Sequence, residues 1–409
     1  MSNLLGVQDP WSGVGNHSWH NGEMGMNFQL SEEQRAIQRM AEEFAQKEIV
    51  PVVDADEKNH RFQRDIIKKM AELGFFGCVI PEKYGGSNTG YLSHALIVEA
   101  VGKVSGSLRI PFNTIAFGPA ATLNNWGTEE QKTRYIPGLM KGEILACFAI
   151  TEPNAGSDVA AISTTARRDG DHYILNGTKT WATFASVADL ILVYVSTDRA
   201  QKARGLSAFI INGHLPGIKT RDIDKMGVHS APTGEIVFED CLIPKDSLLG
   251  QEGEGFKICM STLDNTRLTT AAGALGMAQA CLEAGVKYAM EREQFGQKVG
   301  IFQMNQEKIA DMVLGVEASR LLIYRCAWQK DQGMRNSLET AIAKCFAAET
   351  AVKASGYAMQ ILGAYGYPTE YPVERYYREA KLYQIIEGSS NILKIIIAQD
   401  ALSIRKANR

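Results

Sequence analysis

Glu387 is the residue whose surroundings in this sequence best suit acid–base chemistry. It follows Ile385 and Ile386 and precedes Gly388. Apolar neighbours disfavour the charged carboxylate, so they raise the pKa of a glutamate toward neutral pH, where it is an effective general base. Without further motifs around it, a glutamate at this position is more typical of a solvated loop before a helix.

Arg109 is a lone charge in an otherwise apolar or small-residue stretch. It is the only charged residue between positions 104 and 128. A cation in such a stretch either extends to water or pairs with an anion. The sequence therefore contains a candidate general base and a candidate anion anchor.

The cysteines and histidines, which could also carry chemistry, do not indicate a further site. The seven cysteines are widely spaced without a C-x-x-C pair, and the seven histidines include no H-E-x-x-H motif or paired metal spacing. We therefore expect buried thiols, with no disulfide framework and no metal centre. G-x-G-x-x-G, Walker A and G-x-S-x-G motifs are absent from the sequence.

Composition excludes two broad classes of function. The chain has 409 residues, of which 45% are hydrophobic, and its 43 Lys and Arg nearly balance 46 Asp and Glu. A generic nucleic-acid binder would need a positive field that this balance does not supply. Apolar runs such as 190–195 are shorter than the roughly 20 residues of a membrane span. Residues 1–26 lack both regions of a secretory signal, so we expect a flexible leader and a cytoplasmic protein.

The elements that must position these residues change character along the chain. In a helical part over 27–145, Ser31 and Gln34 form a capping box, Pro51 closes the first helix, and helices follow at 65–73, 90–104 and 129–139. A β part over 146–252 has strands at 172–175, 190–196, 206–211 and 235–238, with hairpin turns at Asp169-Gly170 and Asn176-Gly177. Long helices return over 253–409, at 256–292, 302–330 and 337–362. Because the strands form one block, we expect an α+β multidomain fold and no Rossmann sheet.

Three ordered segments resemble the acyl-CoA dehydrogenase flavoproteins. The first is FAITEPNAGSDVAA (148–161) with KTWATFA (179–185), and the third is YQIIEGSSNI (383–392). The second is QILGAYGYPTEYPVERYYREA (360–380), in which Ala364 stands where Gly or Ser is usual. The resemblance runs from about Asn27 to the C-terminus. It implies an N-terminal all-α domain, a middle β-barrel or sandwich domain and a C-terminal four-helix bundle.

The resemblance implies FAD as the cofactor. An isoalloxazine ring needs an apolar wall and hydrogen-bond donors, which Thr151, Trp181 and Thr183 can supply. By resemblance, Thr183 faces flavin N5 and Trp181 packs on the ring. Further positions that match cofactor contacts are Phe148, Ile150, Ser157, Gly363, Ser389 and Asn391.

A second set of matching residues implies a shared cofactor site. By resemblance, these residues would meet the cofactor of a neighbouring subunit, and they are Arg292, Gln294, Phe295, Gln303 and Gln360. The family assembly is then a homotetramer, built as a dimer of dimers. Taken alone, Arg292 is equally typical of a solvated helix end.

The resemblance also assigns the reaction. Glu387 would remove the α proton of an acyl-CoA thioester while a hydride leaves the β carbon for flavin N5. Its backbone N–H and a flavin ribityl hydroxyl would bind the thioester carbonyl, which Gly388 lets the backbone approach. Ser157, Asp264 and Arg267 would contact coenzyme A. Some relatives carry their base at the position of Thr266, which cannot act as one, so Glu387 is the sole candidate.

Arg109 matches the arginine that holds the distal carboxylate in glutaryl-CoA dehydrogenases. The segments at 267–284, 364–379 and 404–409 are also similar to those enzymes, especially the non-decarboxylating ones from anaerobes, which implies a role in anaerobic aromatic degradation. Gly102 and Ile386 stand where decarboxylating relatives carry Glu and Tyr, which favours oxidation without loss of carbon dioxide. Gly102 and Phe112 fit a larger acyl group equally well, such as benzylsuccinyl-CoA or an alicyclic cyclohexanecarboxyl-CoA.

Several alternatives remain at this point. The electron acceptor implied by the family is electron-transferring flavoprotein, whereas acyl-CoA oxidases share the scaffold but usually carry an extra C-terminal domain. A DNA-associated flavoprotein of the same fold would need a basic C-terminal face and no working base, and Glu387 and a pI near 6.2 argue against it. A flavin-free binding protein would be colourless when purified.

Overall fold

The computed structural model describes residues 29–408, so the leader expected over 1–26 lies outside the described residues. The N-terminal part is helical. Its α-helices are α1 (Glu32–Phe44), α2 (Val53–Asn59), α3 (Arg64–Glu72), α4 (Gly90–Val104), α5 (Ala121–Trp126) and α6 (Glu129–Met140). Two π-helical segments, η1 (Ala45–Ile49) and η3 (Phe112–Ala120), and the 3-10 turn η2 (Glu82–Tyr84) lie between them. The predicted capping box of Ser31 and Gln34 is confirmed at the start of α1.

The middle part is one eight-stranded sheet of mainly antiparallel strands. Its strands are β1 (Ala146–Ala149), β2 (Thr165–Asp169), β3 (His172–Thr183), β4 (Leu190–Ser196), β5 (Leu206–Asn212), β6 (Ile218–Asp222), β7 (Thr233–Pro244) and β8 (Leu248–Leu249). The order is β6-β7-β3-β2-β4-β5-β8, and β1 pairs in parallel with β4. The short turns are η4 (Val159–Ala161), η5 (Arg199–Gly205) and η6 (Lys245–Ser247).

The hairpin turn expected at Asn176-Gly177 is wrong. Asp169 and His172 do flank a two-residue turn, but Gly177 lies inside β3, where the register with β7 shifts. Gly177 has φ 141°, and a Cβ there would lie 2.6 Å from the Thr164 hydroxyl oxygen. The glycine therefore serves a bulge and a close approach to the neighbouring chain rather than a turn.

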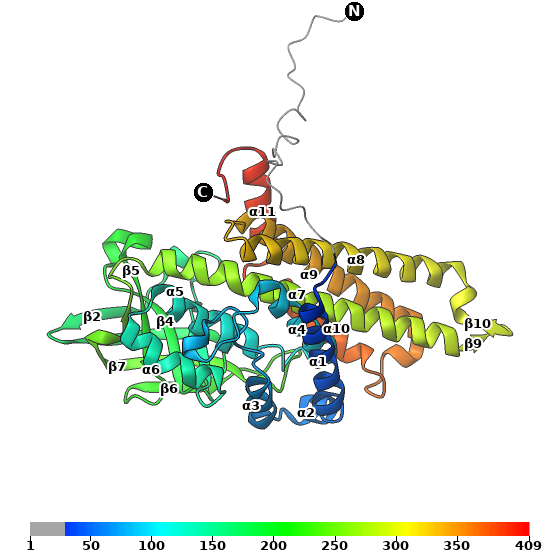
Figure 1. Ribbon diagram of the computed structural model, residues 1–409, viewed down its shortest axis with the longest axis horizontal. Coiled ribbons are helices and arrows are strands. Elements are labelled where there is room, and N and C mark those ends of the chain that lie inside the picture. The colour runs from blue at the N-terminus through cyan, green and yellow to red at the C-terminus, as the bar shows by residue number, and fades with distance from the viewer. Residues whose placement is uncertain (1–28, 409) are drawn as a thin grey trace, which may run out of the picture.

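The C-terminal part consists of long helices. They are α7 (Gly255–Glu291), α8 (Gln303–Asp331), α9 (Ser337–Leu362), α10 (Val373–Tyr383) and α11 (Ser390–Ala401), with the hairpin β9 (Glu293–Gln294) and β10 (Gln297–Lys298) and the turns η7 (Val299–Ile301) and η8 (Gly363–Gly366). Figure 1 shows the sheet at one end of the molecule and the β9–β10 hairpin at the other. The expected order of helical, β and helical parts is confirmed.

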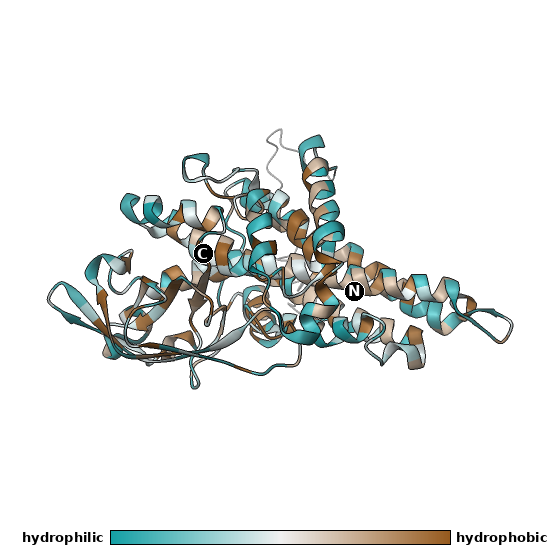
Figure 2. Ribbon diagram, turned by 90° about the horizontal axis from the view of Figure 1, so that it is seen from below, coloured by the Kyte–Doolittle hydropathy of each residue, from teal (hydrophilic) through white to brown (hydrophobic). Residues whose placement is uncertain are grey.

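Burial of apolar residues holds the three parts together. Figure 2 shows apolar segments along the middle of the helices and of the sheet, with hydrophilic segments at the outer ends. All seven cysteines are buried free thiols, as predicted. Within residues 29–408, no helix is both long enough and apolar enough to cross a bilayer.

Helices α4 and α7 pack with their backbones unusually close. A Cβ on Gly102 would lie 3.0 Å from the Gly273 Cα, and one on Gly276 would lie 2.3 Å from the Glu99 carbonyl oxygen. These glycines let the segment that follows α4 approach α7, which carries Thr266 and Arg267. The crossing thus brings Arg109 near the C-terminal helices.

Candidate active site

Glu387 lies in the short turn between α10 and α11. Its backbone is left-handed, with φ 56°, which is uncommon for a residue other than glycine. The carboxylate accepts a hydrogen bond from the Thr266 hydroxyl on one oxygen and from the Asn113 amide, at 3.3 Å, on the other. Three segments far apart in the sequence therefore meet at this carboxylate.

Burial raises the pKa of Glu387 above its ordinary value. The Thr266 hydrogen bond and the charges of Arg109, Arg267 and Lys344 act in the opposite direction, but burial prevails. A carboxylate with a raised pKa is a stronger base once it is ionised, which is the property expected of it from its apolar neighbours.

Two buried cations hold the backbone on either side of this carboxylate. The Arg267 Nε donates to the Glu387 carbonyl oxygen at 3.0 Å, and the Lys344 ammonium donates to the next carbonyl, that of Gly388, at 2.7 Å. Burial lowers the pKa of Lys344 to about 8. With both carbonyls bound, the orientation of the peptide units at Glu387 is fixed.

Arg109 is completely buried and makes no ion pair within residues 29–408, although its charge acts on Glu387 from a distance. Its Nη1 donates to the Asn113 side-chain oxygen at 2.9 Å, while Nε and Nη2 have no hydrogen-bond partner among residues 29–408. The guanidinium lies 5.0 Å from the centre of the Tyr383 ring, whose buried hydroxyl interacts with Arg109 but has no well-formed hydrogen bond within residues 29–408. An unpaired buried cation is costly, so this site is electrostatically incomplete.

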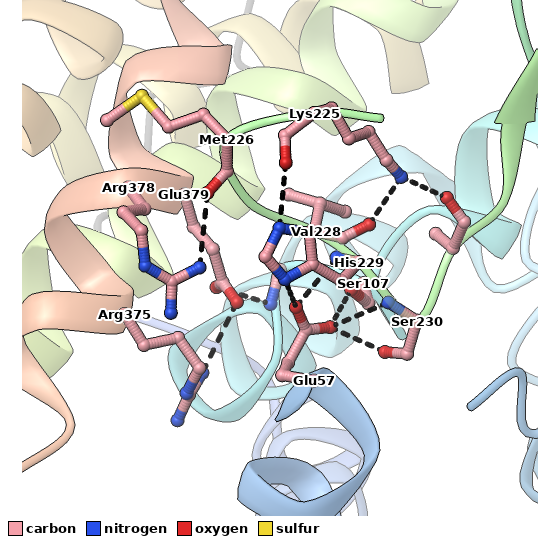
Figure 3. A network of polar contacts seen from close by, with 12 residues as sticks. Glu57, Ser107, Lys225, Met226, Val228, His229, Ser230, Arg375, Arg378 and Glu379 are labelled. Atoms are coloured by element: carbon pink, nitrogen blue, oxygen red, sulfur yellow. Dashed lines mark hydrogen bonds and ion pairs between the residues drawn. The ribbon is translucent and has the colours of Figure 1, made fainter. Parts of the chain in front are cut away.

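A network of buried carboxylates supports the segment that carries Arg109 (Figure 3). Glu57 on α2 accepts hydrogen bonds from the Ser107 and Ser230 hydroxyls and from the backbone N–H of His229 at 2.7 Å. Glu379 on α10 accepts from the backbone N–H of Gly106 at 3.2 Å. Residues just before Arg109 are thereby tied to α2, α10 and the loop between β6 and β7.

The residues expected at the flavin ring come mainly from β1 and the segment after it and from the end of β3. The backbone N–H of Thr180 donates to the Thr151 carbonyl at 2.8 Å, which joins the segment after β1 to the end of β3. Trp181 is 57% exposed and has φ 58°, and Thr183 is half-buried beside it. Phe148 and Ile150 are half-buried and Ser157 is exposed. An exposed indole with hydroxyls at its edge fits a flat aromatic cofactor.

A buried ion pair that sequence reasoning missed holds the segment after β1 against β3. The Lys179 ammonium lies 2.7 Å from Glu152, and both side chains are almost fully buried. Burial opposes ionisation of Glu152, but Lys179 and hydrogen bonds from Ser163 and Thr164 lower its pKa to about 2. Glu152 and Lys179 both lie inside the segments at 148–161 and 179–185 that resemble the family, and the sequence offers no other sign that they pair.

The residues expected to reach a second cofactor lie around the β9–β10 hairpin and the end of α9, away from the sheet (Figure 1). Arg292, Gln294, Phe295 and Gln303 surround the β9–β10 hairpin, Gln360 and Gly363 end α9, and all are exposed. The Arg292 guanidinium lies 5.5 Å from the Tyr365 ring centre, which brings the hairpin base to the turn after Gly363. Figure 1 shows the β9–β10 hairpin at the end of the molecule opposite the sheet, to which Trp181 on β3 belongs. At the start of α11, Ser389 caps the helix through the N–H of Ile392 at 3.4 Å, and Asn391 is exposed.

The residues expected to contact coenzyme A border two pockets. Asp264 pairs with Arg267 at 2.7 Å and lines a pocket of about 540 Å³, to which Lys257, Lys330 and Arg335 contribute cations. Ser157 precedes Asp158, which lines a pocket of about 400 Å³ with Arg199 and Lys202. Sequence reasoning missed these cations, because nothing in their local sequence distinguishes them from surface charges.

Comparison with known proteins places the chain in a family. The family models for the N-terminal, middle and C-terminal domains of acyl-CoA dehydrogenases match residues 31–143, 147–241 and 253–402. The glutaryl-CoA dehydrogenase of Desulfococcus multivorans is 48% identical over 389 residues, which are 94% of this chain and all of that protein.

Two solved structures are also similar over nearly the whole chain. One is glutaryl-coenzyme A dehydrogenase in complex with glutaryl-CoA, with a TM-score of 0.93 and 48% identity over 94% of this chain and 98% of that one. The other comes from structural work on the electron transferring flavoprotein of Acidaminococcus fermentans and flavin-based electron bifurcation. Its TM-score is 0.91, with 44% identity over 92% of this chain and all of that one. The chain therefore belongs to the acyl-CoA dehydrogenase family and is an FAD-dependent oxidoreductase that acts on CH–CH bonds.

Proposed function

We propose that this acyl-CoA dehydrogenase oxidises a dicarboxylyl-CoA of the glutaryl-CoA type without removing carbon dioxide. The observation that carries the proposal is the buried Arg109 guanidinium, which has two unpartnered nitrogens and is linked through Asn113 to Glu387. A distal carboxylate on the acyl group would supply the missing counter-charge. A bidentate carboxylate–guanidinium pair would also fix the position of the acyl chain.

Glu387 is the general base of the proposed reaction. It removes the proton from the carbon next to the thioester carbonyl, and its raised pKa suits this weakly acidic proton. The backbone N–H of Glu387 donates to the thioester oxygen as enolate charge develops, in an orientation that Arg267 and Lys344 maintain through the adjacent carbonyls. FAD, when bound, supplies the acceptor for the hydride from the β carbon.

Two residues support retention of the distal carboxylate. Gly102 contributes no side chain and packs against Gly273, so no carboxylate from that position competes for Arg109. Ile386, which precedes the base, has no hydroxyl to offer to a departing group. Loss of carbon dioxide would break the C–C bond and move the negative charge of the carboxylate onto the acyl chain, and a guanidinium paired with the carboxylate holds that charge in place instead.

Exposed residues at both ends of the molecule would bind the cofactor and join the subunits. Trp181 and Thr183 would hold the flavin ring of one subunit, while the exposed residues around the β9–β10 hairpin would reach the cofactor of the next, in a homotetramer. Ser157 and Asp264 would contact the polar parts of coenzyme A, and the cations that line the two pockets suit its phosphates. Electron-transferring flavoprotein is the proposed acceptor. Seven free thiols fit a reducing compartment such as the cytoplasm.

Product analysis tests the proposed function. The purified holoenzyme would be given glutaryl-CoA, benzylsuccinyl-CoA, cyclohexanecarboxyl-CoA and butyryl-CoA with an artificial electron acceptor, and the products would be resolved by mass. A dicarboxylyl product two hydrogens lighter with its carbon count unchanged is expected. Release of carbon dioxide would contradict the role given to Gly102 and Ile386. Turnover of uncharged acyl groups alone would make Arg109 structural, and direct reduction of oxygen would indicate an oxidase.

A further inference from the structure

Asn113 joins the two charged groups of the site through a single side-chain amide. Its oxygen accepts from Arg109 Nη1 at 2.9 Å, and its nitrogen lies 3.3 Å from the Glu387 carboxylate. The residue is 4% exposed and lies in η3, one helical turn after Arg109. Asn113 was not among the residues singled out from the sequence, because an asparagine in an apolar stretch has no distinctive local pattern.

The chemistry of its neighbours determines how this amide is oriented. A guanidinium can only donate hydrogen bonds, so the Asn113 oxygen must face Arg109 and the NH₂ group must face Glu387. The nitrogen also lies 3.2 Å from both the Thr266 carbonyl and the Thr270 hydroxyl. Three acceptors thus compete for two hydrogens, and the bond to Glu387 is the longest of the three. The Asn113 amide can therefore shift its hydrogens between Glu387 and the two α7 acceptors.

Of the cations around Glu387, only Arg109 is free to change its pairing. The charged groups facing the carboxylate are Arg267 on α7, Lys344 on α9 and Arg109 before η3. Arg267 pairs with Asp264 and binds the Glu387 carbonyl, and Lys344 binds the Gly388 carbonyl. The two unpartnered nitrogens of Arg109 remain available to an incoming anion. An anion there would remove positive potential from the base and make it more basic.

We propose that Asn113 is a positioning residue that couples an anion bound at Arg109 to the orientation and basicity of Glu387. Proton abstraction is then faster for acyl groups that carry a distal acid. The enzyme thereby selects dicarboxylyl substrates at the chemical step as well as in binding. This inference rests on the proposed function, since it takes a distal carboxylate as the anion.

The test compares Asn113→Ala with the unchanged holoenzyme. Anaerobic flavin bleaching would be followed from pH 5.5 to 9 with glutaryl-CoA and with butyryl-CoA, and binding would be followed by perturbation of the flavin spectrum. In the unchanged enzyme we expect a higher kinetic pKa with glutaryl-CoA than with butyryl-CoA. In Asn113→Ala that difference should narrow, because the effect of the anion through space remains while the link through the amide is lost. The ratio of limiting rates should fall about tenfold, as for loss of one hydrogen bond to a charged group. The ratio of dissociation constants should change by less than about threefold, because Arg109 remains.

Asn113→Asp gives a readout that a merely structural role would not. An aspartate here supplies Arg109 with an internal anion and also places a carboxylate oxygen beside Glu387. Both effects raise the pKa of the base, so the pH profile with butyryl-CoA should move toward the profile of the unchanged enzyme with glutaryl-CoA. The preference for glutaryl-CoA should be lost. Asn59→Ala, at an exposed position on α2, is the matched control and should leave both profiles unchanged. If Asn113→Ala does not retain flavin, the same measurements are made on Asn113→Ser.

The two possible failures are distinguishable. If the unchanged enzyme reduces its flavin equally fast with both substrates, the proposed dicarboxylyl function is wrong. If the unchanged enzyme prefers glutaryl-CoA and the Asn113 variants keep that preference and both pH profiles, the function stands and the coupling role of Asn113 is overturned.

Discussion

The Arg267 guanidinium donates to the main-chain carbonyl of Glu387 at 3.0 Å, while the preceding residue on α7 donates to the carboxylate of the same glutamate. One turn of α7 therefore holds both the backbone and the side chain of the candidate base. Because α7 is the longest helix described and is buried along much of its length, it gives this contact a rigid support. The position of the Glu387 carboxylate therefore depends on α7 more than on the loop between α10 and α11 that carries it.

Replacement of the base is the first prediction. Glu387→Gln should retain FAD and lower the rate of flavin reduction by acyl-CoA by about 10²–10⁴-fold, because the amide cannot accept the α proton. Anaerobic stopped-flow absorbance measures this rate. Glu43→Gln, at an exposed position on α1, is the control. Unchanged bleaching in the Glu387 variant would remove the assignment of the base.

The pH dependence of flavin reduction should report the Glu387 carboxylate. The base must be ionised, so the rate should fall as the pH falls through its raised pKa. The Thr266 hydroxyl stabilises the ionised form, so Thr266→Val should raise this pKa further and move the acidic limb of the profile to higher pH. Thr220→Val, on the edge strand β6, should not move it. A shift of the limb to lower pH in Thr266→Val would contradict the hydrogen bond.

Removal of the buried cation should have opposite effects on activity and stability. Arg109→Met should lower kcat/KM for dicarboxylyl-CoA about 100-fold or more, because only this substrate loses an ion pair. Butyryl-CoA should show no comparable loss, because removal of the positive charge makes Glu387 more basic. The free energy of unfolding without substrate should rise by about 1–3 kcal/mol, because an unpaired buried charge is replaced by an apolar chain. Calorimetry and steady-state kinetics measure the two effects. Equal losses with both substrates would refute the carboxylate role.

Gly273 provides the space that Arg109 occupies. A Cβ there would lie 2.8 Å from the Arg109 Cδ and 3.2 Å from the Tyr383 hydroxyl. Gly273→Ala should therefore displace the guanidinium and lower the preference for dicarboxylyl-CoA about tenfold, as expected for loss of one good charged contact. Gly285→Ala on the same helix would meet only the flexible ends of Ile361 and Met312, so it is the matched control. The ratio of kcat/KM for glutaryl-CoA and butyryl-CoA is the measurement.

The buried carboxylate of Glu379 should make stability depend on pH. Burial raises its pKa to about 7, from an ordinary value of 4.5. The folded state therefore binds this proton more tightly than the unfolded state, and the resulting stabilisation is complete below pH 4.5 and is lost as the pH rises through about 7. Glu379→Gln should flatten this loss, which is on the order of 3 kcal/mol. Melting temperatures from pH 5 to 8 test it, with the exposed Glu82→Gln as control; an unchanged slope in Glu379→Gln would assign the pH dependence elsewhere.

The sequence by itself determined the family, the order of the three parts and most element positions. Long helices such as α9 follow from hydrophobic periodicity, and strands such as β4 follow from β-branched runs, because both signals are local. Glu387 and Arg109 stood out as charges in an apolar context, and the resemblance of the segments around them to the family assigned their roles. The turn at Asn176-Gly177 was misassigned because a glycine required by a bulge and a glycine required by a turn look alike in sequence.

Only the tertiary structure decided which charges meet. The link from Arg109 through Asn113 to Glu387, and the contacts of Glu387 with Thr266 and Lys344, join residues of η3, α7, α9 and the turn before α11. Their proximity depends on the close crossing of α4 and α7, which a one-dimensional pattern does not encode. Hydrogen bonds act over about 3 Å, so whether a buried cation is paired depends on packing between distant segments rather than on its neighbours in the chain.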